Sequence, residues 1–417
     1  MDLELNDIQQ ELRSTLARLV RTKYDAANRE TILESEQGWS QDMWKSYADM
    51  GLLGLPFPAE YGGNGMGFAE VAVVMEQFGT ALVLEPFLPT VILGGGLVNT
   101  CGTEAQKKHV LPGVCAGETL LAFAGFEPAS RYDLSSPATV AKPLTGTDAT
   151  ENGADTERNE PGASGTEIAG MTADFTISGE KSHVLGGTAA DYFVVSARTG
   201  DGSAHTGDEL GVFLVARNSE AVTVDERTQA DGLRSAAVVL KDAPAVRLGT
   251  GDATSALQYV IDTANAALMS EAVGAMDASL RMTGQYLHTR EQFGMPIGAN
   301  QALQHRAADL YAAVEEAKSM ALYAKLAITQ GSNDANETRH RDILASKMIV
   351  NDVARLVSQE IIQLHGGIGM TMEYPIGHYA KRLTVIPRTF DETDGITQEL
   401  ASLGGLITPY AADISAV

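Results

Sequence analysis

Three residues in the last third of the chain have side chains suited to holding a phosphorylated nucleotide. Arg290, Gln292 and Phe293 stand close together, directly ahead of Gly294. The planar guanidinium of Arg290 can donate two parallel hydrogen bonds to phosphate oxygens. Gln292 can hydrogen-bond, and the ring of Phe293 can pack against a ligand. The segment therefore has the residue types of a nucleotide-binding element.

A second run, about 70 residues later, contains Gln363, His365, Gly366 and Gly367. Because glycines lack side chains, the backbone N–H groups of Gly366 and Gly367 can approach a phosphate or ribose closely. Each run alone could also have a purely structural role: the first as a helix end before Pro296, the second as a turn between helices. Both runs together, in this order, favour the binding interpretation.

Composition argues against several other classes of protein. A net charge of −24 disfavours a nucleic-acid partner. The sequence contains no long uncharged apolar stretch, so we expect no membrane span. Cys101 and Cys115 lack metal-ligand or CxxC spacing, and the histidines do not cluster, so no metal site is expected. The acidic first residues are not typical of a signal peptide. We therefore expect a reduced, cytoplasmic protein.

The elements that must position these residues can be read from periodicity. Residues 1–119 are predicted to be helical, and Asp7 with Gln10 is a candidate capping box. Residues 120–248 contain short β-rich runs between turns, which predict a mostly antiparallel β domain. A polar segment within it, residues 143–166, is expected to be a mobile surface loop without chemistry. Residues 249–417 are helical again.

This order of helices, strands and helices predicts the α+β class. A doubly wound parallel sheet would need strands and helices to alternate throughout. No GxGxxG motif follows a strand and opens a helix, so a Rossmann-type dinucleotide site is not supported.

The two runs belong to longer motifs that resemble acyl-CoA dehydrogenases. The first extends from Tyr286 through Pro296 to Gln301 and His305, and the second from Gln363 to the Glu373-Tyr374-Pro375 triplet. The segments 51–56 and 60–63 also match the family pattern, so the resemblance covers nearly the whole chain. It implies an N-terminal helical domain, a middle β domain, and a C-terminal four-helix domain that also makes oligomer contacts.

The resemblance implies FAD as cofactor and at least a dimer, because in the family the two motifs complete one FAD site across a subunit interface. The implied activity is α,β-dehydrogenation of an acyl-CoA thioester to a trans-2-enoyl-CoA, with electrons passed to an electron-transfer flavoprotein. The implied cofactor-binding residues are Arg290, Gln292, Phe293, Gln301, Gln363, Gly366 and Gly367.

The middle domain departs from the family pattern beside the expected flavin. Phe126 replaces a threonine, and Arg131 with Tyr132 replaces Gly-Ser. His183 stands where tryptophan is common, and Leu185 where a Thr or Ser usually bonds the flavin. Backbone groups can still serve the isoalloxazine ring.

The catalytic base is the second departure. The reaction needs a desolvated carboxylate to take the α proton. Counting from the second motif without gaps, the family's glutamate position is Phe390, and Asp391 and Glu392 follow it. We expect Asp391 or Glu392 to be the base, the alternative being two solvated loop acids. Other members carry the base near the position of Ala264, where Asp262 and Glu271 flank it without matching.

Further segments resemble the small subunit of pimeloyl-CoA dehydrogenase. They are residues 82–88, 131–133 and 374–384. This likeness implies a dicarboxyl or bulky ring-bearing acyl group and a larger sister chain. The chain is then either an active enzyme, as a homo-oligomer or a heterotetramer, or a non-catalytic subunit that completes the FAD site of a heteromer. An acyl-CoA oxidase is a third possibility that the sequence does not separate.

Overall fold

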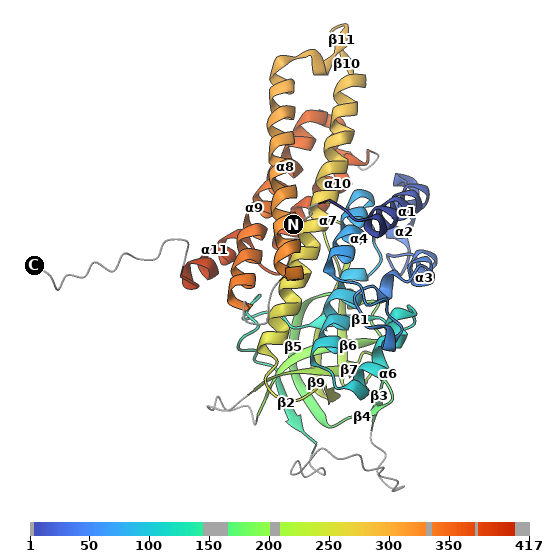
Figure 1. The fold of residues 1–417 in the computed structure, drawn as a ribbon, viewed down its shortest axis with the longest axis vertical. Coiled ribbons are helices and arrows are strands. Elements are labelled where there is room, and N and C mark those ends of the chain that lie inside the picture. The colour runs from blue at the N-terminus through green and yellow to red at the C-terminus, as the bar shows by residue number, and fades with distance from the viewer. Residues whose placement is uncertain (1–3, 145–165, 201–208, 331–335, 372–373, 405–417) are drawn as a thin grey trace, which may run out of the picture. The chain divides into compact units, whose positions relative to one another are not determined.

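The computed structural model describes residues 4–144, 166–200, 209–330, 336–371 and 374–404. The chain forms two compact units, each assembled from separated segments (Figure 1). The helical unit comprises Met1–Val20, Ala72–Leu82 and Asn265–Val417, and the mixed unit comprises Arg21–Val71 and Val83–Ala264. The predicted loop at 143–166 lies outside the described residues except at its two ends.

A seven-stranded sheet dominates the mixed unit. Because β7 pairs with both β6 and β9, strands β6, β2, β5, β9 and β7 form a closed ring. Most pairings are antiparallel, as predicted, but β1 and β2 both run parallel to β6. The strands are β1 Leu121–Ala124, β2 Val140–Pro143, β5 Phe175–Leu185, β6 Tyr192–Thr199, β7 Glu209–Ala216, β8 Val222–Thr228 and β9 Arg234–Arg247; β3 Glu167–Ile168 and β4 Met171–Thr172 form a separate pair.

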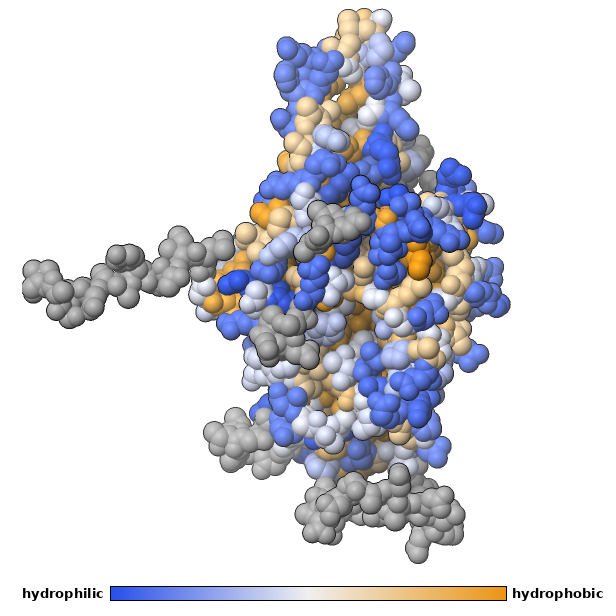
Figure 2. Space-filling model, in the orientation of Figure 1, coloured by the Kyte–Doolittle hydropathy of each residue, from blue (hydrophilic) through white to orange (hydrophobic). Residues whose placement is uncertain are grey.

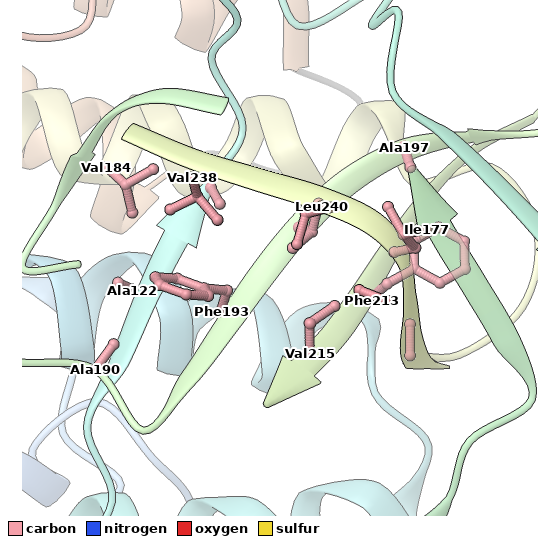
Figure 3. Packing of buried hydrophobic residues seen from close by; sticks show 14 of the residues in the cluster. Ala122, Ile177, Val184, Ala190, Phe193, Ala197, Phe213, Val215, Val238 and Leu240 are labelled. Atoms are coloured by element: carbon pink, nitrogen blue, oxygen red, sulfur yellow. The ribbon is translucent and has the colours of Figure 1, made fainter. Parts of the chain in front are cut away.

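The ring encloses a core of β-branched, aromatic and small side chains, the types that favour strands (Figure 3). Phe193 from β6 and Phe213 from β7 are fully buried, as is Ile177 from β5. Burying a side chain of this size contributes about 1.5–3 kcal/mol. The sheet is therefore a stable scaffold for the loops that connect its strands.

Helices and short turns complete the mixed unit. They are α2 Ala26–Glu34, α3 Gln41–Asp49, the π-helix η3 Leu88–Gly95, α5 Gly96–Cys101 and α6 Glu104–Cys115, with short 3₁₀ turns η1 Leu52–Gly54 and η2 Ala59–Tyr61. Helix α6 begins with a capping box in which the side chains of Thr103 and Gln106 bond each other's backbone N–H groups.

Long helices build the helical unit. They are α7 Thr254–Thr289, whose first residues belong to the mixed unit, α8 Gln301–Gln330, α9 Asn336–His365, α10 Ile376–Val385 and α11 Thr393–Ser402, joined by parts of α1 Asp7–Lys23 and α4 Phe68–Ala81. The predicted capping box of α1 is wrong by one residue. Asn6 and Gln9 bond each other's backbone N–H groups, at 2.9 and 3.2 Å, because the helix begins at Asp7.

Two glycines allow α4 and α7 to cross at backbone contact within the helical unit. A Cβ added to Gly79 would lie 1.9 Å from the carbonyl oxygen of Glu271, and one added to Gly274 would lie 1.9 Å from that of Glu76. A Cβ added to Gly284, also on α7, would meet none of the described atoms within 4 Å. Gly274 therefore serves helix packing rather than leaving open space.

Within the described residues, no helix is long and apolar enough to cross a membrane. The same part of the chain holds no group of three or more His, Cys, Asp or Glu side chains placed to bind a metal ion.

Candidate functional site

The first motif forms a β-hairpin between α7 and α8 (Figure 1). Strand β10, Glu291–Gln292, pairs with β11, Met295–Pro296, and the tip between them has φ angles of 55° at Phe293 and 80° at Gly294. The backbone N–H of Ile297 donates to the carbonyl of Arg290 at 2.8 Å and closes the hairpin. Glycine at the tip permits the left-handed backbone that a tight turn requires.

The hairpin presents its functional side chains to the outside. Arg290 and Gln292 are exposed, Phe293 is 100% exposed, and Met295 is 48% exposed. Figure 2 shows apolar residues at the end of this hairpin. Gln301, the first residue of α8, is also exposed. A fully exposed aromatic ring beside a guanidinium is suited to binding another molecule.

The second motif forms the end of α9 and the following turn, η5 Gly366–Met370. Gln363, Gly366 and Gly367 are exposed, and φ at Gly366 is 65°. Within the described part of the chain, a Cβ added to either glycine would have no neighbour within 4 Å. The backbone is therefore open at both glycines. Glu373 lies outside the described residues.

Three rings join the two motifs. His365 stacks on Tyr286 with 4.4 Å between ring centroids, and Tyr374 lies 5.3 Å from His365 and 6.0 Å from Tyr286. The Nδ1 atom of His365 donates to the carbonyl of Ile361 at 2.7 Å. Burial lowers the pKa of His365, and its buried Nε2 has no hydrogen-bond partner among the residues that the structure describes. The ring cluster thus ties the start of the hairpin motif to the glycine turn.

These features fit a dinucleotide. The open backbone at Gly366 and Gly367 can approach phosphate or ribose, and the exposed guanidinium of Arg290 can bind phosphate. The unpartnered Nε2 of His365 is a neutral acceptor beside the same turn. The sequence places His365 between Gln363 and Gly366 but does not predict that its ring stacks on Tyr286.

The two candidate bases differ in their surroundings. Asp391 is half-buried, burial raises the pKa of its carboxyl, and its Oδ1 accepts from the backbone N–H of Glu392 at 2.8 Å. Glu392 is exposed and lies 3.7 Å from Arg388, measured from Oε1 to Nε. Phe390, at the gap-free family position, is only 5% exposed. Of the two acids, Asp391 has the environment of a base and Glu392 that of a surface residue.

Glu271 is unsuited to proton abstraction. Its Oε1 and Oε2 accept from the Nε and Nη2 atoms of Arg382 at 2.6 and 2.9 Å, and both side chains are 8% exposed. Both carboxylate oxygens are therefore engaged by one guanidinium fork. Asp262 is fully buried and accepts from Gln258 at 3.1 Å.

A buried ion pair that the sequence analysis did not predict anchors the loop expected beside the flavin. Lys181 Nζ donates to Glu127 Oε1 at 2.8 Å and to the carbonyl of Gly125 at 3.0 Å. Glu127 also accepts from the backbone N–H groups of Ala138 and Thr139. Although burial opposes ionisation, Lys181 holds the pKa of Glu127 below its usual value. The two residues are 54 positions apart in the sequence, so only the folded chain reveals the pair.

Nearby, Phe126 is buried and packs edge-on against Tyr132, with 5.3 Å between ring centroids. Arg131 and His183 both adopt positive φ angles, of 52° each. His183 lies where the pairing of β5 with β9 shifts register, and burial lowers the pKa of its ring. The departures from the family pattern therefore coincide with an irregular backbone.

Similarity to known proteins identifies the family of this chain. Models of the acyl-CoA dehydrogenase N-terminal, middle and C-terminal domains match residues 6–118, 138–243 and 254–389. The chain belongs to the acyl-CoA dehydrogenase family. Enzymes of this family are oxidoreductases that act on CH–CH groups.

Individual members of the acyl-CoA dehydrogenase family match along nearly their full length. A probable acyl-CoA dehydrogenase of Bacillus subtilis, YngJ, is 27% identical over 389 residues, which cover 90% of this chain and 92% of that protein. Acyl-CoA dehydrogenase IpdE2 of Mycolicibacterium smegmatis is 27% identical over 372 residues, covering 89% and 90%. A solved variant of the steroid acyl-CoA dehydrogenase Tcur3481–Tcur3483 is 26% identical, has a TM-score of 0.79, and covers 95% of this chain and 97% of that chain. The predicted fold class is confirmed.

Proposed function

We propose that the chain binds FAD and catalyses α,β-dehydrogenation of an acyl-CoA thioester to the trans-2-enoyl-CoA. The observation that carries this proposal is the joining of the Arg290 hairpin to the open Gly366–Gly367 turn through the rings of Tyr286, His365 and Tyr374, in a member of this family.

The FAD would be held by the exposed groups of both motifs. Arg290 binds the pyrophosphate, Gln292 and Phe293 contact the adenosine, and the backbone at Gly366 and Gly367 approaches phosphate or ribose. Gln301 and Gln363 supply amide groups to the same cofactor. The bound flavin supplies the acceptor for the β hydrogen, which leaves the substrate as hydride.

Asp391 is the proposed base. Its half-burial raises its proton affinity, which suits removal of an α proton made acidic by the thioester carbonyl. Glu392, the other candidate, is solvated and less suited. The proton passes from the substrate Cα to the carboxylate of Asp391.

The exposed hairpin supports an oligomer in which it completes a neighbouring subunit's FAD site. Phe293, with all of its surface exposed, would otherwise leave a large apolar ring in water. The assembly is a homo-oligomer or a heterotetramer with a sister chain, and an electron-transfer flavoprotein is its proposed oxidant. Similarity to the solved steroid acyl-CoA dehydrogenase Tcur3481–Tcur3483 favours a bulky ring-bearing acyl group over a dicarboxyl one.

A non-catalytic subunit is the second candidate. Phe390 fills the gap-free glutamate position, and the Asp391 carboxylate lies against Gly395 in the first turn of α11, where it accepts from the N–H of Glu392. An acid just before a helix can have the purely structural role of placing negative charge at the positive N-terminal end of that helix. The chain would then supply Arg290 and the glycine turn to a site whose base comes from its sister.

Purification of the chain alone separates these candidates. A yellow protein whose flavin spectrum is bleached by ring-bearing acyl-CoA under anaerobic conditions supports the active enzyme. A colourless chain that becomes yellow only with a sister subunit supports the second candidate. A chain that binds no flavin under either condition would contradict both.

A further inference from the structure

The turn that carries Asp391 has an unusual backbone. Phe390 and Asp391 are consecutive non-glycine residues with φ angles of 61° and 119°. Residues with a side chain rarely adopt positive φ, and such conformations persist only where surrounding contacts hold them. The contacts that hold this turn are therefore part of any role that Asp391 has.

Two side chains of α9, one helical turn apart, hold the backbone that enters this turn. Lys347 Nζ donates to the carbonyl of Thr389 at 2.7 Å, and Asn351 Nδ2 donates to the carbonyl of Pro387 at 3.4 Å. Lys347 and Asn351 are each 2% exposed. Both donors thus act from within the helical unit on carbonyls of the same segment that are two residues apart.

A buried ammonium group is costly unless it is hydrogen-bonded and faces negative charge. The charged groups that act on Lys347 are Asp391 from the turn and Glu399 from α11. Glu399 also contacts His340 of α9 at 2.9 Å, and Glu392 adds negative charge beside Asp391. Lys347 is thus a buried cationic side chain of α9 that faces Asp391 and Glu399.

We propose that Lys347, assisted by Asn351, is a positioning residue for the base: it holds the Phe390–Asp391 turn and sets the proton affinity of Asp391. The proposal rests on the proposed function, in which Asp391 accepts the α proton. The Lys347–Thr389 bond fixes the residue directly before the strained pair, and the ammonium charge favours the ionised carboxylate.

The electrostatic consequence has a definite sign. Asp391 must be ionised to accept a proton, so the rate falls as pH drops through its pKa. Burial raises the pKa of Asp391, while Lys347 opposes that rise. Burial also lowers the pKa of Lys347 to about 7. Loss of the lysine charge should therefore move the acid limb of the rate profile to higher pH.

Lys347→Met tests the proposal because methionine keeps the length and apolar stem but removes both donor and charge. Arg355→Met is the control, since Arg355 lies on the same helix with its side chain 71% exposed. The measurements are hydrogen exchange of residues 386–395 in the purified, FAD-loaded protein, and the pH dependence of anaerobic flavin bleaching by acyl-CoA.

We expect Lys347→Met to speed exchange of this segment about fivefold to tenfold, the factor given by one buried hydrogen bond of typical strength. The acid limb should shift upward in the same variant, and neither quantity should change in Arg355→Met. Unchanged exchange together with an unchanged acid limb would overturn the proposal. Faster exchange with an unshifted limb would also overturn it, because Lys347 would then be structural only.

Asn351→Leu provides a second test that does not depend on folding of the lysine variant. It should speed exchange of the same segment and leave the acid limb in place, because no charge is removed. Unchanged exchange would contradict the proposed clamp. Full bleaching activity of Asp391→Asn would instead refute the proposed base, and the exchange measurements, which need no substrate, keep the two failures apart.

Discussion

At the scale of single residues, Asp391 and Glu392 make a matched pair of adjacent acids with different exposure. Asp391→Asn keeps the shape and the acceptor that faces the N–H of Glu392, but removes the proton acceptor. We expect anaerobic flavin bleaching to slow about 10²–10⁴-fold, the usual contribution of general base catalysis. Glu392→Gln should change the rate little. Equal loss in both variants would contradict the assignment of Asp391.

The buried ion pair of Glu271 with Arg382 allows a second prediction at the scale of single residues. Removal of one partner leaves a buried charge without compensation, so Glu271→Gln should lower the free energy of unfolding by about 3–5 kcal/mol. Lys45→Ala is the control, because the Lys45–Asp49 pair is 74% and 64% exposed and should cost under about 1 kcal/mol. Urea unfolding monitored by circular dichroism measures both, and equal losses would show that the burial of the pair is irrelevant.

At the scale of elements, the crossing of α4 and α7 depends on glycine. Gly274→Ala places a methyl group against the carbonyl oxygen of Glu76 and should cost at least about 1–3 kcal/mol of unfolding free energy by overpacking. Gly284→Ala, on the same helix but facing open space, should stabilise by up to about 1 kcal/mol. Thermal unfolding of both variants checks the opposite signs. A stabilising Gly274→Ala would contradict the close approach.

Element types were predictable where they depend on local pattern. The amphipathic spacing of α1 and the β-branched runs of β6 and β7 gave the correct kinds of element and their order. The capping box was misplaced by one residue because Asn6–Gln9 and Asp7–Gln10 have the same spacing. The parallel pairing of β1 with β6 was not predictable, because register between distant strands depends on the whole sheet.

The candidate site also contains features that local sequence patterns indicate and features that they do not. The hairpin and the glycine turn are encoded by short runs, so the sequence could propose their residues as binding residues. The Lys181–Glu127 and Glu271–Arg382 pairs join residues 54 and 111 positions apart, and no local pattern marks such partners. Lys347 was missed for the same reason, since its partner Thr389 is 42 positions away.

At the scale of the whole molecule, the proposed oligomer makes Arg290 a contact to the FAD of a neighbouring subunit. Arg290→Ala should lose FAD during gel filtration, because the proposed pyrophosphate contact is gone. Arg355→Ala is the control for removal of an exposed arginine. The ratio of flavin absorbance to protein absorbance in the eluted peak measures retention. Unchanged occupancy in Arg290→Ala would refute the pyrophosphate contact.

Helix α9 carries Lys347 near its middle and His365 at its end. At about 1.5 Å per residue, the helix separates these two side chains by roughly 27 Å. Inserting one residue between them would lengthen that separation by about 1.5 Å and rotate one group about 100° relative to the other. The length of this stretch is therefore a constraint on evolution: homologues that keep both groups should tolerate substitutions within it, but neither insertions nor deletions.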